Sequence, residues 1–339
     1  MTTTLPAEWA AQAAVMLTWP REDGDFGSDF AAVERCFLQI AAAVTRFEPL
    51  HVNFGRAPEE LRRKLADAGA RLDRVRIEAV ESDDVWARDH GPITVFRDGK
   101  PLHLDFTFNG WGGKFSAARD NRITRALAQR GALPYAVETL DFVLEGGGIE
   151  SDGLGTLLTT ERCLLAKTRN PQFSRTQIEA KLKDWFGLSR VLWLRHGDLI
   201  GDDTDGHIDT IARFCDARTI AYQACDDRGD AHYEDLRAMA DELAALRTAY
   251  GAPYRLVPLP LPGAIHDGSG RRLPAGYPNF LILNGAVLAP VYGDAHDALA
   301  MERLRGCFPD REVVSIDCRP LIAQYGSLHC VTMQIPKAA

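Results

Sequence analysis

Apolar residues recur at helical spacing in six segments of the chain, with charged residues between them. In the fourth of these segments, Ile178, Leu182 and Trp185 fall on one face of a helix, and the charged side chains fall elsewhere. The pattern predicts helices near Phe30–Arg46, Pro58–Ala68, Ala118–Arg130, Arg175–Phe186, Tyr233–Tyr250 and Ala295–Cys307.

Shorter runs rich in β-branched and aromatic residues come in pairs, and a few turn residues separate the members of each pair. In the third pair the separating residues are Asn284 and Gly285, a dipeptide typical of a two-residue type I′ turn. Helices that alternate with such hairpins predict an α/β protein. The expected hairpins join Ile93–Phe96 to Leu102–Phe106, Thr210–Phe214 to Thr219–Gln223, and Phe280–Leu283 to Ala286–Val291.

Polar residues stand just ahead of successive strand runs, at intervals of about 50 to 70 residues. A period of this size, with a helix and a hairpin in each unit, predicts a repeated ββαβ-like module. The units share negligible sequence identity, so chance recurrence in an ordinary α/β protein is the alternative. No long linker divides the chain, and we expect a single domain over residues 1–339. The marker residues are Asp89, Glu145, His207, Asn279 and Cys330.

The composition is that of an ordinary globular protein, with 46% apolar and 25% charged residues. The net charge of −8 argues against a nucleic-acid or anionic-membrane partner and favours a cationic one. The apolar stretch Ala10–Trp19 is too short to span a membrane. The seven scattered cysteines form no Cys-x-x-Cys pair, which suits a reducing cytoplasm and argues against a disulfide framework or structural zinc.

Two motifs place a carboxylate beside a group that could complement a planar cation. Trp86 stands three residues before Asp89, so an aromatic face and a carboxylate lie near each other. A core Trp and a turn-capping Asp are the alternative. Glu145 stands just before three glycines, Gly146–Gly148, which permit close approach of the backbone to another group. A flexible turn with an exposed Glu is the alternative there.

A third motif surrounds His207 and Asp209, which are two residues apart and expected at the start of a strand. Side chains at that spacing point to the same face, so both could face one cavity, and His can exchange protons near neutral pH. The preceding aspartates, residues 202–205, invite a metal interpretation. Their spacing does not fit an EF-hand loop, and no second His lies at a zinc-ligand spacing, so we expect no metal. A loop of solvated aspartates is the alternative.

The fourth motif contains Cys330, in a small-residue turn that enters a short strand. A thiol at such a place can face a cavity, and its thiolate is a strong nucleophile, although a free Cys is more often a small buried apolar residue. His329 would point to the opposite face of the strand, so His207 is the better candidate base. The chain has no Gly-x-Ser-x-Gly or Walker-type motif, which argues against serine hydrolases and P-loop enzymes.

Taken together and in order, these motifs resemble the agmatine deiminases, a group of peptidyl-arginine deiminases within the guanidino-group-modifying enzymes. Motifs in sequence order are far more specific than any one of them, and they extend from end to end of the chain. The resemblance rests on residues 6–9 with 18–20, 84–89 with 91–92, 108–113, 145–147, 206–209 and 328–332.

The resemblance implies the pentein fold, a five-bladed α/β propeller with pseudo-fivefold ββαβ modules. It also implies a cytoplasmic homodimer or larger assembly and no cofactor. The implied reaction is hydrolysis of agmatine to N-carbamoylputrescine and ammonia through an S-alkylthiouronium intermediate, in polyamine synthesis or agmatine use. By resemblance, the nucleophile is Cys330, the general acid/base His207, its orienting group Glu145, the guanidinium ligands Asp89 and Asp209, and the aromatic walls Trp86 and Trp111.

Two departures bear on the substrate rather than on the reaction. Residues 21–26 replace an acidic and aromatic run of the longer family members, and the segment between His207 and Cys330 is shorter. Agmatine requires an acid for its far amine, and Asp203 and Glu8 are candidates. The alternatives are deimination of arginine side chains or free arginine, methylarginine hydrolysis, amidino transfer, a metal-dependent hydrolase, and a non-catalytic propeller that binds cations.

Overall fold

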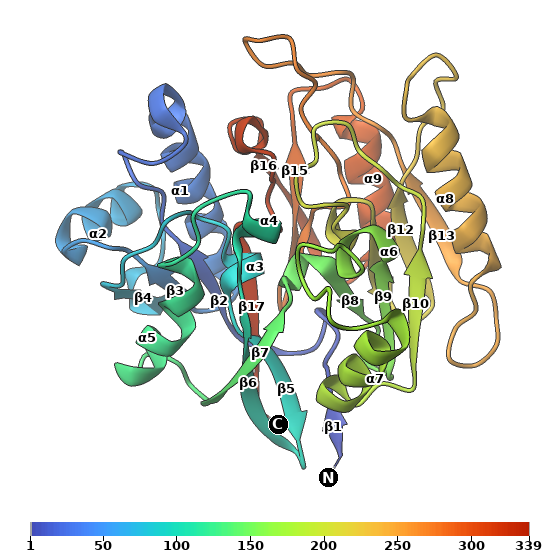
Figure 1. Cartoon of the computed structure of the whole chain (residues 1–339). Coiled ribbons are helices and arrows are strands. Elements are labelled where there is room, and N and C mark those ends of the chain that lie inside the picture. The colour runs from blue at the N-terminus through green and yellow to red at the C-terminus, as the bar shows by residue number, and fades with distance from the viewer. Residues whose placement is uncertain (1, 339) are drawn as a thin grey trace.

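The computed structural model describes residues 2–338, which form five sheets with helices around their periphery (Figure 1). Two of these sheets have four strands and three have three. In spatial order they are β1 (Thr3–Thr4), β5 (Ile93–Arg97), β6 (Lys100–Thr107) and β7 (Ala136–Val143); β10 (Arg190–Leu194), β9 (Thr156–Thr160) and β8 (Ile149–Ser151); β11 (Ala212–Asp216), β12 (Thr219–Gln223) and β13 (Arg255–Leu259); β14 (Leu281–Ile282), β15 (Ala286–Val291) and β16 (Glu312–Asp317); and β17 (Thr332–Pro336), β2 (Gln12–Thr18), β3 (Leu50–Asn53) and β4 (Val75–Glu78).

Each of these sheets combines an antiparallel strand pair with a parallel pair formed across a helix. In the second sheet β8 runs antiparallel to β9, and the chain then passes through α7 to β10, which is parallel to β9. The same order recurs in the other sheets. In the last sheet the C-terminal β17 pairs with β2 near the N-terminus, so the two ends of the chain share one sheet. The predicted α/β architecture is confirmed.

Most helices lie where the apolar spacing predicts them, and the differences have local causes. Helix α8 ends at Ala245 rather than Tyr250, because Arg247 and Pro253 pair across a turn. Residues before Ile123 form a 3₁₀ turn, in which the Asp120 carboxylate accepts backbone N–H groups of residues 83 and 84. The helices are α1 (Phe30–Phe47), α2 (Pro58–Asp67), α3 (Ala87–His90), α4 (Gly110–Gly113), α5 (Ile123–Gln129), α6 (Glu161–Leu164), α7 (Arg175–Phe186), α8 (Tyr233–Ala245) and α9 (Asp297–Cys307), with 3₁₀ turns η1 (Gly27–Asp29), η2 (Leu72–Arg74), η3 (Asp120–Arg122), η4 (Gly146–Gly148), η5 (Ile208–Thr210) and η6 (Leu321–Gln324).

The three predicted hairpins are confirmed, but the type I′ turn at Asn284-Gly285 is wrong. A type I′ turn requires positive φ at both central residues, and neither residue has it. Tertiary hydrogen bonds fix the turn instead. The Asn284 side chain accepts from the backbone N–H of Gln12 and donates to its carbonyl, and the Asn284 backbone N–H donates to Glu48. The contacts of Asn284 with other parts of the fold therefore override the local preference of the dipeptide.

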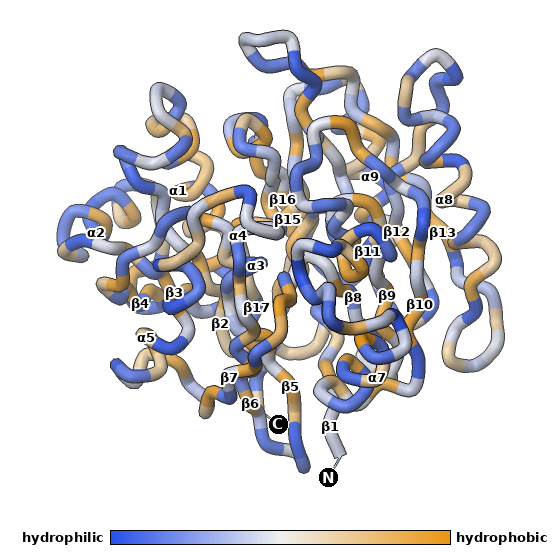
Figure 2. Tube along the Cα trace, viewed as in Figure 1, coloured by the Kyte–Doolittle hydropathy of each residue, from blue (hydrophilic) through white to orange (hydrophobic). Residues whose placement is uncertain are grey.

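The largest apolar cluster joins sheets that are far apart in sequence. Phe37 and Ile40 of α1 belong to the same buried cluster as Leu17 of β2 and Val287 of β15. Figure 2 shows that apolar stretches follow the inner strands and hydrophilic stretches gather in the peripheral loops. Burial of one such large side chain contributes about 1.5–3 kcal/mol. Among the described residues, no helix has the length and apolar character needed to cross a membrane.

The segments that precede the first strand of each antiparallel pair meet one another. Helix α3 precedes β5 and contacts η4, which precedes β8. Turn η4 in turn contacts η5, which precedes β11, and α3 also contacts β17. The repeated module therefore brings the polar residues ahead of separate strand pairs into one region.

Candidate active site

His207 and Asp209 do lie beside the other candidates, but the predicted strand start is wrong. Asp209 is part of η5 and His207 precedes it, while β11 begins only at Ala212. A tight turn is closed here because Thr204 Oγ1 accepts the His207 backbone N–H and Thr210 Oγ1 donates to the His207 carbonyl. The 3₁₀ geometry, rather than strand alternation, aims the two side chains.

Cys330 lies in the turn that leads into β17, not in the strand itself. Its carbonyl accepts the backbone N–H of Arg88, which ties the turn to α3 at 3.1 Å. Its Sγ atom lies 3.4 Å from Asn279 Oδ1 and 4.0 Å from Asp209 Oδ2. Burial, and then the carboxylates of Asp209 and Asp89, raise the pKa of the Cys330 thiol well above its usual range.

A narrow cavity opens onto Cys330, and acids and aromatic rings dominate its lining. Five of the predicted site residues line it. Trp86 and Trp111 face each other edge to face, with ring centroids 6.5 Å apart. The lining residues are Asp84, Trp86, Asp89, Trp111, Phe115, Asp203, Thr204, Gln324, Tyr325, Gly326 and Cys330.

Asp89 and Asp209 form a buried pair of acids beside the thiol. Asp89 accepts the Trp111 indole N–H at 2.9 Å and the Gly147 backbone N–H at 3.0 Å. Burial raises the pKa of Asp89 to about 7, with a further contribution from the Glu145 carboxylate. Burial and the Asp89 carboxylate raise the pKa of Asp209 well above its usual range, and its Oδ1 atom has no protein hydrogen-bond partner. Two crowded acids with spare acceptor capacity suit a bound cation.

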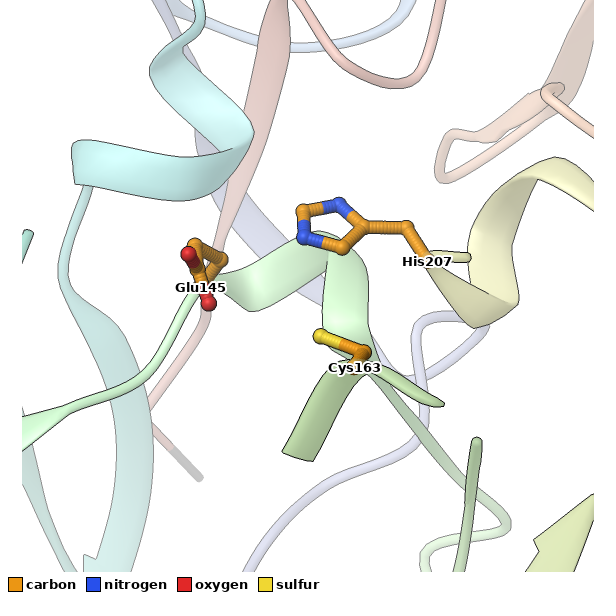
Figure 3. Close-up of side chains that lie close together, drawn as sticks. All are labelled: Glu145, Cys163 and His207. Carbon is orange, nitrogen blue, oxygen red and sulfur yellow. The ribbon is translucent and has the colours of Figure 1, made fainter. Parts of the chain in front are cut away.

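His207 is completely buried, and neither ring nitrogen has a hydrogen-bond partner among the described residues. Its Nδ1 lies 3.6 Å from Asp89 Oδ1. Burial, and then the Arg169 cation, lower the pKa of His207 well below its usual value, so the imidazole is neutral at pH 7. Figure 3 shows this ring close to both Glu145 and Cys163. Glu145 makes no hydrogen bond to the His207 ring. Both of its carboxylate oxygens accept the Nε–H of Arg169 instead.

The two candidate acids for the far end of a substrate have different surroundings. Asp203 lines the cavity at Cys330, and burial together with Asp202 raises its pKa to about 7. Glu8 does not line that cavity. Its carboxylate lies 2.7 Å from Arg213 Nη2 and 2.7 Å from His329 Nε2, so the expectation for Glu8 is wrong. Two buried partners hold Glu8 behind the site.

A model of the Porphyromonas-type peptidyl-arginine deiminase family matches residues 4–336 of the chain. The chain belongs to this family. The match covers every motif from which the resemblance was drawn, and it covers the residues that meet around Cys330.

Relatives of this deiminase-family chain align with it over nearly the whole length of both sequences. Agmatine deiminase of Stutzerimonas stutzeri is 38% identical over 98% of this chain and 95% of its own length. A structure of C. jejuni agmatine deiminase, a cysteine-to-serine variant with substrate bound, is 34% identical with a TM-score of 0.92, covering 99% and 97%. A Porphyromonas gingivalis structure provisionally named an arginine deiminase is 51% identical with a TM-score of 0.94, covering 99% of each chain.

Sequence reasoning about this deiminase-family chain missed Arg169. Its fully buried guanidinium donates to Glu145, to Asp205 Oδ2 at 2.7 Å and to the carbonyl of Thr204 at 2.7 Å. A buried cation must be paired, so Arg169 fixes Glu145 and the loop that carries Asp203 at one side of the cavity. An arginine outside every recognised motif gives no sequence signal of such a role.

Two groups of buried donor atoms are close enough to share a metal ion: Glu145 with Cys163 and His207, and Glu8 with Glu150 and His329. In both groups the carboxylates are already neutralised by arginine. Arg169 binds Glu145 in the first, and Arg213 binds both glutamates in the second. A cation would have to displace a buried ion pair, so neither group carries a metal assignment.

Proposed function

We propose that this chain is an agmatine deiminase that hydrolyses the guanidino group of agmatine to N-carbamoylputrescine and ammonia. The observation that carries the proposal is the lining of the cavity at Cys330. It combines a thiol, two indole rings and three acids, Asp84, Asp89 and Asp203, and none of its described lining residues is Lys or Arg. A substrate with a cation at each end matches that lining, because both of its ends meet carboxylates.

The relatives named above as agmatine deiminases support the same reaction for this chain. We also infer that the five sheets are the blades of a pentein propeller, and that residues 1–339 form one catalytic domain. The recurrent strand–strand–helix–strand order supports this arrangement, as does the meeting of segments ahead of successive strand pairs.

Binding fixes the guanidinium in one orientation. Asp89 and Asp209 accept its N–H groups in charge-assisted hydrogen bonds, and Trp86 and Trp111 stack on or border its plane. The bound cation offsets the repulsion that raises the thiol pKa, so substrate binding favours ionisation of Cys330. The neutral imidazole of His207 accepts the thiol proton.

The thiolate then attacks the central guanidinium carbon and forms a C–S bond. His207, now protonated, donates its proton to the terminal nitrogen, and the C–N bond breaks as ammonia leaves. The remaining species is an S-alkylthiouronium cation on Cys330. Positioning of thiolate and carbon by two carboxylates can supply several kcal/mol of the barrier reduction.

Water completes the cycle. Neutral His207 takes a proton from a water molecule that attacks the thiouronium carbon, the C–S bond breaks, and the ureido product forms with a free thiol. His207 returns the water proton to the Cys330 thiolate, and the extra proton of the thiouronium cation passes to solvent, where the ammonia released earlier takes it up as ammonium, so atoms and charge balance. Throughout, Glu145 acts on His207 as a buried anion held by Arg169, not as a direct hydrogen-bond partner.

Arginine is the second candidate substrate, because the P. gingivalis relative carries an arginine deiminase name. A colorimetric ureido assay with agmatine, free arginine and an arginine peptide separates the two. We expect agmatine to have the highest kcat/KM, since its far ammonium can pair with Asp84 and Asp203, whereas free arginine adds a carboxylate there and a peptide backbone offers no cation there. Preference for either arginine substrate would overturn the assignment.

Asp203→Asn tests the acid at the far end of the substrate. Loss of a charged acceptor is expected to raise KM for agmatine about tenfold. Butylguanidine has the same guanidino group without the amine, so its KM should stay unchanged and serves as the matched control. An equal rise in both KM values would show that Asp203 acts on the guanidino end or on the fold.

Gly147→Ala tests the crowding at the catalytic centre. A Cβ at this position would lie 2.5 Å from His207 Nδ1, 2.8 Å from Asp89 Oδ1 and 3.2 Å from Asp209 Oδ2. The displaced side chains should lower kcat about 100-fold, the usual cost of a misplacement near 1 Å. Gly268→Ala is the control, because a Cβ there meets no atom within 4 Å. Equal activity of both variants would contradict the convergence of these three residues.

A further inference from the structure

His329 makes two hydrogen-bond contacts, one to an acid of the active site and one to an acid behind it. Its Nδ1 lies 2.7 Å from Asp209 Oδ2, and its Nε2 lies 2.7 Å from Glu8 Oε2. All three side chains are buried. The expectation that His329 points away from the site on a strand is therefore wrong, because residues 328–331 form a turn.

These contacts fix the number of protons in the group. A neutral imidazole has one N–H donor, and an ionised carboxylate has none. Two hydrogen bonds, one at each ring nitrogen, therefore require two protons shared by Asp209, His329 and Glu8. Either the imidazole carries both, or one carboxyl group is protonated.

The charges around the group decide where the second proton lies. Glu8 is ionised, because Arg213 Nη2 lies 2.7 Å and Arg88 Nη2 3.8 Å from its carboxylate. The same two arginines oppose a positive charge on His329, and Asp89 opposes a negative charge on Asp209. With no cation bound, the second proton therefore lies on Asp209, whose O–H donates to Nδ1 while Nε2–H donates to Glu8. The charged or titratable groups that face the trio are Asp89, Asp202, Glu48, Glu150, Cys330, Arg88 and Arg213.

We propose that Asp209, His329 and Glu8 form a proton-sharing unit in which His329 accepts the proton of Asp209 when a guanidinium binds. The proton moves from Oδ2 to Nδ1, so that Asp209 becomes a carboxylate and His329 an imidazolium between two carboxylates. No proton passes to solvent. His329 is thus a positioning residue that supplies Asp209 in ionised form to the cation, and the inference rests on the proposed guanidino substrate.

Asp89 has no imidazole within hydrogen-bond distance: it accepts two N–H donors that cannot take a proton, and the ring of His207 lies farther off, with Nδ1 3.6 Å from Asp89 Oδ1. Its pKa of about 7 means that above pH 7.5 it is already largely ionised. Asp84 and Asp203, whose pKa values are also raised to about 7, are likewise largely ionised at pH 8, so proton exchange at that pH reports mainly on Asp209. This difference between the two acids makes the proposal measurable.

The test is calorimetric titration of agmatine into the Cys330→Ser protein at pH 8, in buffers of different ionisation enthalpy. Serine removes turnover and the thiol proton. We expect close to zero protons released and an affinity nearly independent of pH between 7.5 and 9. In Cys330→Ser/His329→Gln we expect one proton released per ligand, and an affinity that rises about tenfold per pH unit.

Glu8→Gln in the Cys330→Ser background is a second variant. Without the Glu8 carboxylate the His329 imidazolium is not stabilised, so the affinity for agmatine should rise with pH as steeply as in the His329→Gln variant. Asp105→Asn is the control, because Asp105 is a buried acid that pairs with Arg125 away from the unit, and the affinity of this variant should stay nearly independent of pH. Release of one proton by the Cys330→Ser parent, or flat profiles in both unit variants, would overturn the proposal. A site that binds guanidinium chloride but not agmatine would instead overturn the substrate, and the same titration with guanidinium chloride would then test the unit.

Discussion

Replacing Cys330 by serine is expected to abolish ammonia release from agmatine. The hydroxyl is a far weaker nucleophile than a thiolate, and removal of a covalent nucleophile lowers kcat by about 10⁴-fold or more. The side chain is nearly isosteric and buried in a cavity-lining turn, so the fold and the affinity for agmatine should persist. Ureido product and bound agmatine are measured on the same preparation.

Cys225→Ser is the matched control, because Cys225 is partly exposed and lies outside the cavity. It should retain full activity. If Cys330→Ser kept its activity, the nucleophile assignment would be wrong. If the unaltered protein bound agmatine but released no ammonia, the chain would be a cation-binding relative without catalysis.

Replacing His207 by glutamine is expected to lower kcat by about 10²- to 10⁴-fold, the usual contribution of a general acid/base. Glutamine fills similar space but cannot transfer a proton. Because burial and Arg169 lower the His207 pKa, the imidazole is neutral over the working pH range and begins the cycle as a base. Activity should therefore fall as pH drops far enough to protonate it in the free protein.

The acidic limb of the kcat/KM profile should be set first by Asp89 and Asp203, whose pKa values are raised to about 7, and only at lower pH by His207, so this lower step should be lost in His207→Gln. His196→Gln is the control, because His196 is partly exposed and pairs with Asp235 away from the cavity. It should retain both rate and pH profile. A His207→Gln variant with normal kcat would show that another group moves the protons.

Much of the fold could be predicted because its signals are local. Helix α7 begins and ends where the apolar spacing places it, since Ser174 forms a capping box with Gln177 and Gly187 ends the helix in left-handed conformation. Asn284-Gly285 carries an equally local signal, but its turn differs because Gln12 and Glu48 hold Asn284 from distant segments.

The candidate site divides in the same way. Cys330, Asp89 and Trp86 could be found because their motifs combine reactive or aromatic residue types with turn residues. Arg169 and the partnership of His329 with Glu8 could not, because each depends on which distant carboxylate a buried cation or imidazole meets. Those pairings are set by the packing of separate sheets, and no spacing along the chain records them.

Rapid acid quenching of the protein with agmatine, followed by mass spectrometry of its peptides, tests the central claim most directly. The account predicts that the peptide containing Cys330 transiently gains the mass of agmatine less one ammonia. This adduct should decay as N-carbamoylputrescine appears and be absent in Cys330→Ser. Formation of the ureido product with no adduct at any quench time, or an adduct on a different cysteine, would contradict it.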